Sequence, residues 1–177
     1  MQTLTGLRIT LFCCWLCGPL PGAQAVTATG TFQVLITILK SCAVSAGAGS
    51  NLNLGSVNAG AVNTSGSSTI SVTCSKTTPY FIGLAPSTAN GGTNTGSGSM
   101  SSVVNSSTNT DKVPYQLNQT SATGPVWGNT ATSTTVGNGV AGTGTGLPQS
   151  YTVYATTPGS NFTPDNYADT VTVNVNY

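Results

Sequence analysis

Hydrophobic residues occur along this chain in short alternating or continuous runs, separated by stretches rich in Gly, Ser, Thr and Asn. After residue 25, no segment repeats apolar residues at the helical spacing i, i+3, i+4 and i+7 without a Gly, Pro or Ser/Thr break. Short runs bounded by turn residues are typical of an all-β sandwich. The expected strands are Gly30–Leu39, Ala43–Val44 with a continuation near Leu52–Leu54, Ser68–Cys74, Tyr80–Leu84, Val113–Gln119, Tyr151–Ala155 and Thr170–Tyr177.

The first and the last of these runs alternate most regularly. The apolar residues that share one face are Phe32, Val34, Ile36 and Ile38 in the first run, and Val171, Val173, Val175 and Tyr177 in the last. A period of two predicts that each strand buries one face and exposes the other. The pattern alone leaves open whether the first run belongs to its own sandwich or pairs with another molecule.

Two long polar segments, residues 90–110 and 130–146, interrupt the series of expected strands. A linker between two domains is one interpretation of such composition. The apolar runs on either side are too few to build two cores, so long loops or hairpins within one sandwich are favoured.

The first 25 residues have the features of a secretory signal. Arg8 and the N-terminal amine supply positive charge, "LFCCWLCGPL" supplies an apolar core, and Ala23 and Ala25 form an A-x-A site with cleavage before Val26. The apolar core is too short, and too interrupted by Gly and Pro, to be a transmembrane helix. We therefore expect an exported protein with no membrane span in the mature chain.

Removal of residues 1–25 would leave two of the five cysteines, Cys42 and Cys74. An even count in an exported chain predicts a disulfide formed in an oxidising compartment. A zinc site is disfavoured, because two thiols in a chain without histidine cannot fill a zinc coordination shell. Cys17 also allows a lipoprotein signal, but the residues before it lack the small pair that lipoprotein processing favours.

Charged residues make up only 4% of the chain, whereas about a quarter is usual in soluble domains. The many β-branched residues argue against disorder as the reason. After residue 25 the charged side chains are Lys40, Lys76 and Lys112 against Asp111, Asp165 and Asp169, which gives a net charge of zero. A neutral chain offers no electrostatic attraction for nucleic acid, so we expect no nucleic-acid partner.

Groups that could perform catalysis are scarce, since the chain has no His and no Glu. We expect no catalytic residue, no cofactor and no metal site. Asp165 and Asp169 could attract calcium, but the further oxygen ligands and turn Gly of a calcium loop are missing, so a polar turn is favoured. A Lys–Asn isopeptide bond is a further alternative, although the chain has no Glu and the sequence alone does not establish which Asp lies beside a lysine in the fold.

Several sequence features together resemble the spore coat protein U domain, the pilin-like domain of archaic, Csu-type chaperone–usher pili. The features are the A-x-A signal followed by "GTFQVLITI" and Cys42, then "NLNLGSV", "ISVTC", "VPYQLNQ" with "VWGN", and the closing "DNYADTVTVNVNY". They cover most of Thr29–Tyr177 in the order of the family. The closing motif is the most specific of them, whereas Leu54 departs from the Phe that the family often has.

The resemblance implies an all-β fold: an immunoglobulin-like, pilin-type antiparallel β-sandwich that is completed by an exchanged N-terminal donor strand. The domains would be a signal peptide at 1–25, a donor strand at 26–39 and a pilin-like sandwich at 40–177. Donor side chains Phe32, Val34, Ile36 and Ile38 would enter a groove beside the strand that carries Val171, Val173, Val175 and Tyr177 in another subunit.

The resemblance also implies partners and a location. The partners would be identical or related pilin subunits, a periplasmic chaperone and an outer-membrane usher, and the product would be an extracellular fibre at the cell surface that supports adhesion and biofilm formation. The alternative function is a secreted β-sandwich adhesin or carbohydrate-binding module that uses aromatic residues such as Trp127, Tyr151 and Tyr154.

Overall fold

The computed structural model describes residue 22 and residues 24–177. Ala23 and most of the predicted signal peptide lie outside these residues, so the cleavage before Val26 stays a prediction. Among the described residues, no helix has the length and apolar character needed to cross a membrane. The chain divides into two units, residues 1–37 and residues 38–177, which are described separately.

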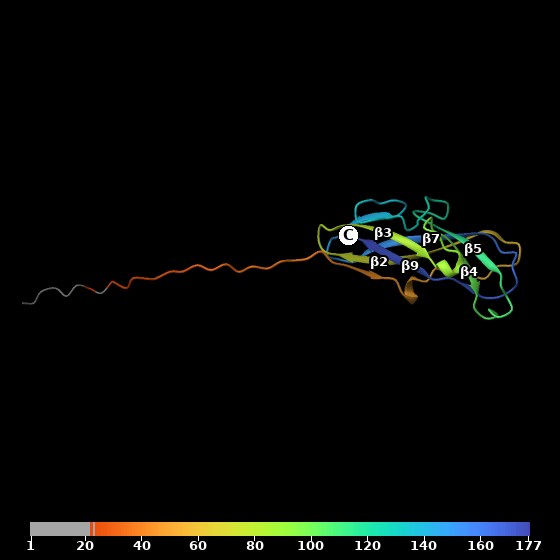
Figure 1. The fold of residues 1–177 in the computed structure, drawn as a ribbon, viewed down its shortest axis with the longest axis horizontal. Helices are drawn as coiled ribbons and strands as arrows, with labels where there is room; N and C mark the ends of the chain where they lie inside the picture. Colours follow the sequence, from red (N-terminus) through yellow and green to blue (C-terminus); the bar gives the residue numbers. More distant parts are fainter. Residues whose placement is uncertain (1–21, 23) are drawn as a thin grey trace, which may run out of the picture. The chain divides into compact units, whose positions relative to one another are not determined.

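The second unit consists of two antiparallel sheets (Figure 1). The larger sheet has the strand order β1 (Cys42–Ser45), β2 (Val62–Cys74), β7 (Gln149–Gly159), β5 (Lys112–Asn118), β4 (Ser97–Ser102) and β8 (Tyr167–Ala168). The smaller sheet has the order β6 (Val140–Thr143), β3 (Pro79–Pro86) and β9 (Val171–Asn176). Two short 3-10 turns, η1 (Ala48–Ser50) and η2 (Thr88–Asn90), lie in the connections. The predicted all-β antiparallel sandwich is confirmed.

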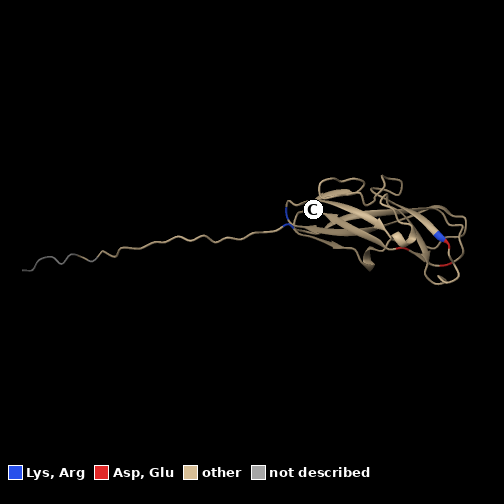
Figure 2. Ribbon diagram, viewed as in Figure 1, with Lys and Arg blue, Asp and Glu red and all other residues tan. Residues whose placement is uncertain are grey.

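The core forms from residues that alternate with small polar ones along the strands. In β2, Ile70, Val72 and Cys74 are buried, while Ser71 and Thr73, which lie between them, are half-buried. Trp127 is 1% exposed, and its ring nitrogen donates a hydrogen bond of 2.9 Å to the backbone oxygen of Ile82. Charged residues are few in this sandwich (Figure 2), so apolar packing and hydrogen bonds between neutral groups supply most of its contacts.

Several expected strand boundaries differ from the structure. The prediction of a strand near Leu52–Leu54 is wrong, because Leu52 and Leu54 pack their side chains against the core and the segment joins no sheet. The expected strand Gly30–Leu39 does not form within the described chain, where residues 24–41 have no strand partner. The polar segments 90–110 and 130–146 instead contain β4 and β6, which confirms a single sandwich with strands inside its long connections.

Candidate functional site

The sandwich is open along one side, where a groove of about 570 Å³ runs between the two sheets. Its apolar lining comes from both sheets and includes Ile70 on β2, Leu84 on β3, Leu117 on β5, Val153 on β7 and Val173 on β9. These residues are inward-facing positions, and all of them except the half-buried Val173 are buried in the core, so they form the floor of the groove. A groove with an apolar floor between two sheets can hold an extended segment of another chain.

One rim of the groove is β9, which is an edge strand. It pairs with β3 over six residues, from Val171 opposite Pro86 to Asn176 opposite Phe81. No strand of the described chain pairs with its other edge. An unpaired edge offers backbone donors and acceptors to an incoming strand.

The opposite rim is the segment that follows β1, residues 46–54. Leu52 and Leu54 are half-buried against the core, and the segment lies directly on β2 at Gly66. A Cβ atom at Gly66 would sit 2.6 Å from the backbone oxygen of Asn53, so glycine is required for this close approach. The small inward residues of β2, Gly66 and Ser68, thus make room for both the rim and the groove.

The predicted acceptor residues on the last strand divide into two pairs. Val171 and Val173 line the groove. Val175 packs against the core beyond it, and Tyr177 follows the end of β9 and is 48% exposed. The structure therefore brings half of the predicted set to the groove, and Tyr177 does not belong to it.

The predicted donor residues form an exposed apolar segment. Exposed fractions are 85% for Phe32, 86% for Val34, 86% for Ile36 and 82% for Ile38. Leu35 and Leu39, on the other face, are equally open to solvent. A run of large apolar side chains this exposed is unusual in a stable monomer and marks a surface for association.

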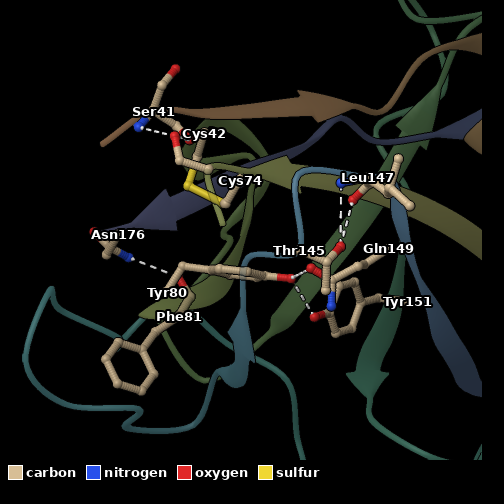
Figure 3. Close-up of a disulfide and its surroundings, with 11 residues drawn as sticks. Ser41, Cys42, Cys74, Tyr80, Phe81, Thr145, Leu147, Gln149, Tyr151 and Asn176 are labelled. Atoms are coloured by element: carbon tan, nitrogen blue, oxygen red, sulfur yellow. Dashed lines mark hydrogen bonds between the residues drawn. A yellow bond between two sulfur atoms is a disulfide. The ribbon is translucent and has the colours of Figure 1, made fainter. Parts of the chain in front are cut away.

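The disulfide predicted from the cysteine count is present, with an S–S distance of 2.03 Å between Cys42 and Cys74 (Figure 3). The two residues are register partners in the β1–β2 ladder. Cys42 follows Leu39 by three residues, so the disulfide ties the start of the sandwich directly behind the exposed apolar segment. Cys74 is 1% exposed and belongs to the core.

The closing motif DNYADT forms a polar network at one end of the groove. The hydroxyl of Tyr115 donates to Asp169 at 2.6 Å, and the amide of Asn90 donates to it at 2.8 Å. Burial, and then the hydrogen bond to Asp169, raise the pKa of Tyr115. Asp169 and Tyr115 both line the groove. Their hydrogen bond joins β5 to the turn that leads into β9.

The other carboxylate of this motif, Asp165, is also an acceptor of protein hydrogen bonds. Ser102 donates to it at 2.5 Å and the side-chain amide of Asn109 at 3.1 Å. These bonds, led by that of Ser102, lower the pKa of Asp165 to about 2. The described residues contain no group of three or more His, Cys, Asp or Glu side chains that could hold a metal ion.

Two of the three aromatic residues named for a carbohydrate-binding alternative have structural partners. Trp127 is in the core. The Tyr151 hydroxyl lies 2.6 Å from that of Tyr80, which also donates to Gln149 at 3.0 Å (Figure 3). Burial, followed by the contact with Tyr151, raises the pKa of Tyr80. Tyr151 is half-buried in this network, and Trp127, Tyr151 and Tyr154 together line a second, smaller pocket of about 330 Å³.

Sequence reasoning missed most of the groove lining. The floor residues Leu84, Leu117 and Val153 were expected as ordinary strand residues, and within the rim at 46–54 only Leu52–Leu54 was expected to be part of a strand. The parity of each run does identify inward faces, but parity cannot tell which inward face lacks a covering strand. The contact between Asp169 and Tyr115 joins residues 54 positions apart and has no local signal.

The family model of the Spore Coat Protein U domain matches residues 28–174, and the chain belongs to this family. No protein in the curated set matches it. A search of solved structures finds, among others, a chain in the crystal structure of the CsuC–CsuE chaperone–tip adhesion subunit pre-assembly complex from archaic chaperone–usher Csu pili of Acinetobacter baumannii. That match has 22% sequence identity and a TM-score of 0.45, and it covers 80% of this chain and 40% of that chain. The present chain therefore spans less than half the length of that chain.

Proposed function

We propose that this protein is an exported structural subunit of a chaperone–usher pilus or spore-coat-like surface fibre. Its subunits polymerise by donor-strand exchange, in which residues 26–39 of one copy enter the groove of another. The observation that carries this proposal is the open apolar groove of about 570 Å³ beside the free edge of β9. Membership of the Spore Coat Protein U domain family supports it.

The exposed segment and the groove have complementary chemistry. The segment supplies an unpaired extended chain with Phe32, Val34, Ile36 and Ile38 on one face, and the groove supplies apolar floor residues and one free strand edge. Pairing would add a strand to the sheet, which is the β-augmentation mode of recognition. Each of these side chains would contribute about 1.5–3 kcal/mol on burial, before the cost of ordering the segment.

The geometry of the exchange gives a fibre. The donor segment and the acceptor groove are different surfaces of one chain, so the contact between copies is heterologous and does not close on itself. Identical or related pilin subunits are therefore the principal partners. A surface with little charge suits a filament whose contacts depend on burial and backbone pairing, and adhesion and biofilm formation are the roles we propose for it.

An unfilled groove also requires protection before assembly. An exposed apolar face with a free strand edge promotes aggregation. We infer that a periplasmic chaperone covers the groove during export and that an outer-membrane usher exchanges it for the next subunit. The route from the periplasm to the cell surface is part of the same proposal, as is the domain division into 1–25, 26–39 and 40–177.

The test compares the chain that begins at Val26 with a chain that begins at Lys40, each with and without a peptide of residues 27–39. We expect the longer chain to form SDS-resistant oligomers, and we expect the shorter chain to gain thermal stability only when the peptide is added. A peptide with Ile36→Asp is the matched control and should not stabilise it. The proposal is wrong if the longer chain is a stable monomer and the peptide neither binds nor stabilises the shorter one.

A further inference from the structure

Three side chains with complementary chemistry meet beside the groove, although they come from distant parts of the sequence. Lys112 begins β5, Asn90 ends η2, and Asp169 lies just before β9. The Nζ atom of Lys112 is 2.6 Å from Oδ1 of Asn90, and Nδ2 of Asn90 is 2.8 Å from Oδ1 of Asp169. The side-chain amide of Asn90 is therefore held between an amine and a carboxylate.

This arrangement contains each group that is needed to form an amide bond between a lysine amine and an asparagine side chain. Lys112 supplies a primary amine as the nucleophile, Asn90 supplies a carboxamide carbon as the electrophile, and Asp169 contacts the nitrogen that would leave. We propose that Lys112 and Asn90 form an intramolecular isopeptide bond, with Asp169 as the proton-transfer group. The proposal is independent of strand exchange, because all three residues lie within one sandwich.

The reaction balances without an oxidant or a further reactant. Lys112 first passes its third proton to solvent, which its exposed side chain reaches directly. The neutral amine attacks Cγ of Asn90, so that Nζ and Nδ2 are briefly bonded to the same carbon. Asp169 accepts a proton from Nζ and returns it to Nδ2. The Cγ–Nδ2 bond then breaks and ammonia leaves, which converts one amine and one carboxamide into a secondary amide.

The surrounding contacts hold the reacting groups in place. Ser101 donates from its hydroxyl to the Asn90 side-chain oxygen, and Lys112 donates to that same hydroxyl at 2.5 Å. Asp169 is fixed by Tyr115, which is 7% exposed and donates to its second oxygen. Holding reactants together in this way replaces a bimolecular encounter, and in well-oriented intramolecular reactions the effective molarity reaches about 10⁵–10⁸ M.

The bond would fasten η2 and the β3–β4 connection to β5 beside the turn that leads into β9. Hydrogen bonds alone already join these elements in the structure. A covalent bond and a purely hydrogen-bonded contact differ in mass and in protease cleavage, so an experiment can distinguish them. Because the chain after residue 25 has only three lysines and no arginine, trypsin produces few fragments and each can be assigned.

In the experiment, the chain that begins at Val26 is first folded and incubated. It is then denatured, reduced and digested with trypsin, and the masses of the fragments are measured. The cleavable lysines are Lys40, Lys76 and Lys112. Trypsin does not cleave at a lysine whose amine is acylated, so we expect one fragment of residues 77–177 that is lighter than its sequence by one ammonia. Cleavage at Lys76 is the internal control for digestion, and both disulfide cysteines fall in the separate fragment 41–76.

Three variants test the roles of the groups. Lys112→Arg keeps the charge and the cleavage site, and it should restore complete cleavage into 77–112 and 113–177. Asp169→Asn should slow formation of the uncleaved fragment about a hundredfold or more, because the proton-transfer group is lost. Lys76→Arg is the matched control: it makes the same exchange at a lysine outside this cluster and keeps the cleavage site, so the uncleaved fragment 77–177 should still form.

The proposal is overturned if the unsubstituted protein gives fragments 77–112 and 113–177 at full mass after prolonged incubation in the folded state. Hydrolysis of Asn90 to Asp would also overturn it, since that reaction releases ammonia but adds water, raises the mass and leaves Lys112 cleavable. Equal amounts of the uncleaved fragment in the unsubstituted protein and in Asp169→Asn would exclude Asp169 as the proton-transfer group.

Discussion

Two segments of this protein have the same alternating pattern and different fates. Residues 30–39 and residues 171–176 both place apolar side chains at every second position and contain no charged residue. The second segment forms β9 and pairs with β3 over six residues. The first forms no strand, and its apolar side chains are exposed. Alternation therefore makes a segment able to form a strand, and a partner decides whether it does so.

The two segments also differ in how their ends are fixed. The turn before β9 is held by the hydrogen bonds of Asp165 and Asp169 to residues of β4, β5 and η2. The first segment is tied only at its end, where the disulfide of Cys42 follows it. One segment thus lacks a partner, and the other has a free edge. The following predictions test whether residues 30–39 of one copy pair with the free edge of β9 in another copy.

The largest expected effect comes from charging one face of the exposed segment. Ile36→Asp places a carboxylate on the face that we propose enters the groove, whereas Leu35→Asp places it on the opposite face. We expect Ile36→Asp to abolish assembly, because an apolar side chain worth about 1.5–3 kcal/mol is replaced by a charge that is costly to bury. Size-exclusion chromatography and SDS-resistance of the full mature chain measure the difference.

Leu35→Asp is the matched control, with the same charge one position away, and it should retain most assembly. Equal loss in both variants would show that general apolar character, rather than one face of a strand, drives association. Normal assembly of Ile36→Asp would contradict the donor role of this segment.

The sequence was sufficient to predict strands whose apolar residues are strong and regular. β2, β3 and β7 contain an expected run, and β5 and β9 match one to within a single residue at each end. Val, Ile, Leu and Tyr at alternating positions can be buried on only one face, which makes such strands recognisable. The runs failed to locate β4, whose sequence SGSMSS has a single large apolar residue. That strand is defined by backbone pairing with β5 from Ser97 to Ser101, which a hydrophobic pattern does not record.

The candidate site was predictable only in part, for a related reason. Val171 and Val173 were recognised by parity on the last strand, and they line the groove. Tyr177 continues the same parity but follows the end of β9, since a sequence period does not indicate where pairing stops. The rim at residues 46–54 depends on contact with Gly66, a tertiary approach between segments that no local pattern describes.

An intermediate effect is expected from the disulfide behind the exposed segment. Replacing Cys42 and Cys74 by Ser opens a loop with a sequence separation of 32 residues. We expect a loss of about 3–4 kcal/mol in the free energy of unfolding by the chain-entropy relation. Denaturant unfolding measures it, and a reducing agent should destabilise the unsubstituted protein without affecting the double Ser variant. Unchanged stability in the double variant would mean that the β1–β2 ladder alone holds this end of the sandwich.

The smallest effect concerns the polar anchor of β9. The pKa of Asp165 is lowered from 3.8 to about 2 by bonds from Ser102 and Asn109, so its charged form is favoured in the folded protein. Stability from this charge is therefore fully present above pH 3.8 and is lost as the pH falls toward 2. We expect Asp165→Asn to lower the melting temperature slightly at pH 7 and to have almost no effect at pH 2.

Carboxyl titration by NMR checks the cause, because Ser102→Ala should move the pKa of Asp165 back toward its ordinary value. A melting-temperature difference that stays constant down to pH 2 would show that the Asp165→Asn substitution disturbs the turn by shape, and that the negative charge does not hold β9 in its place.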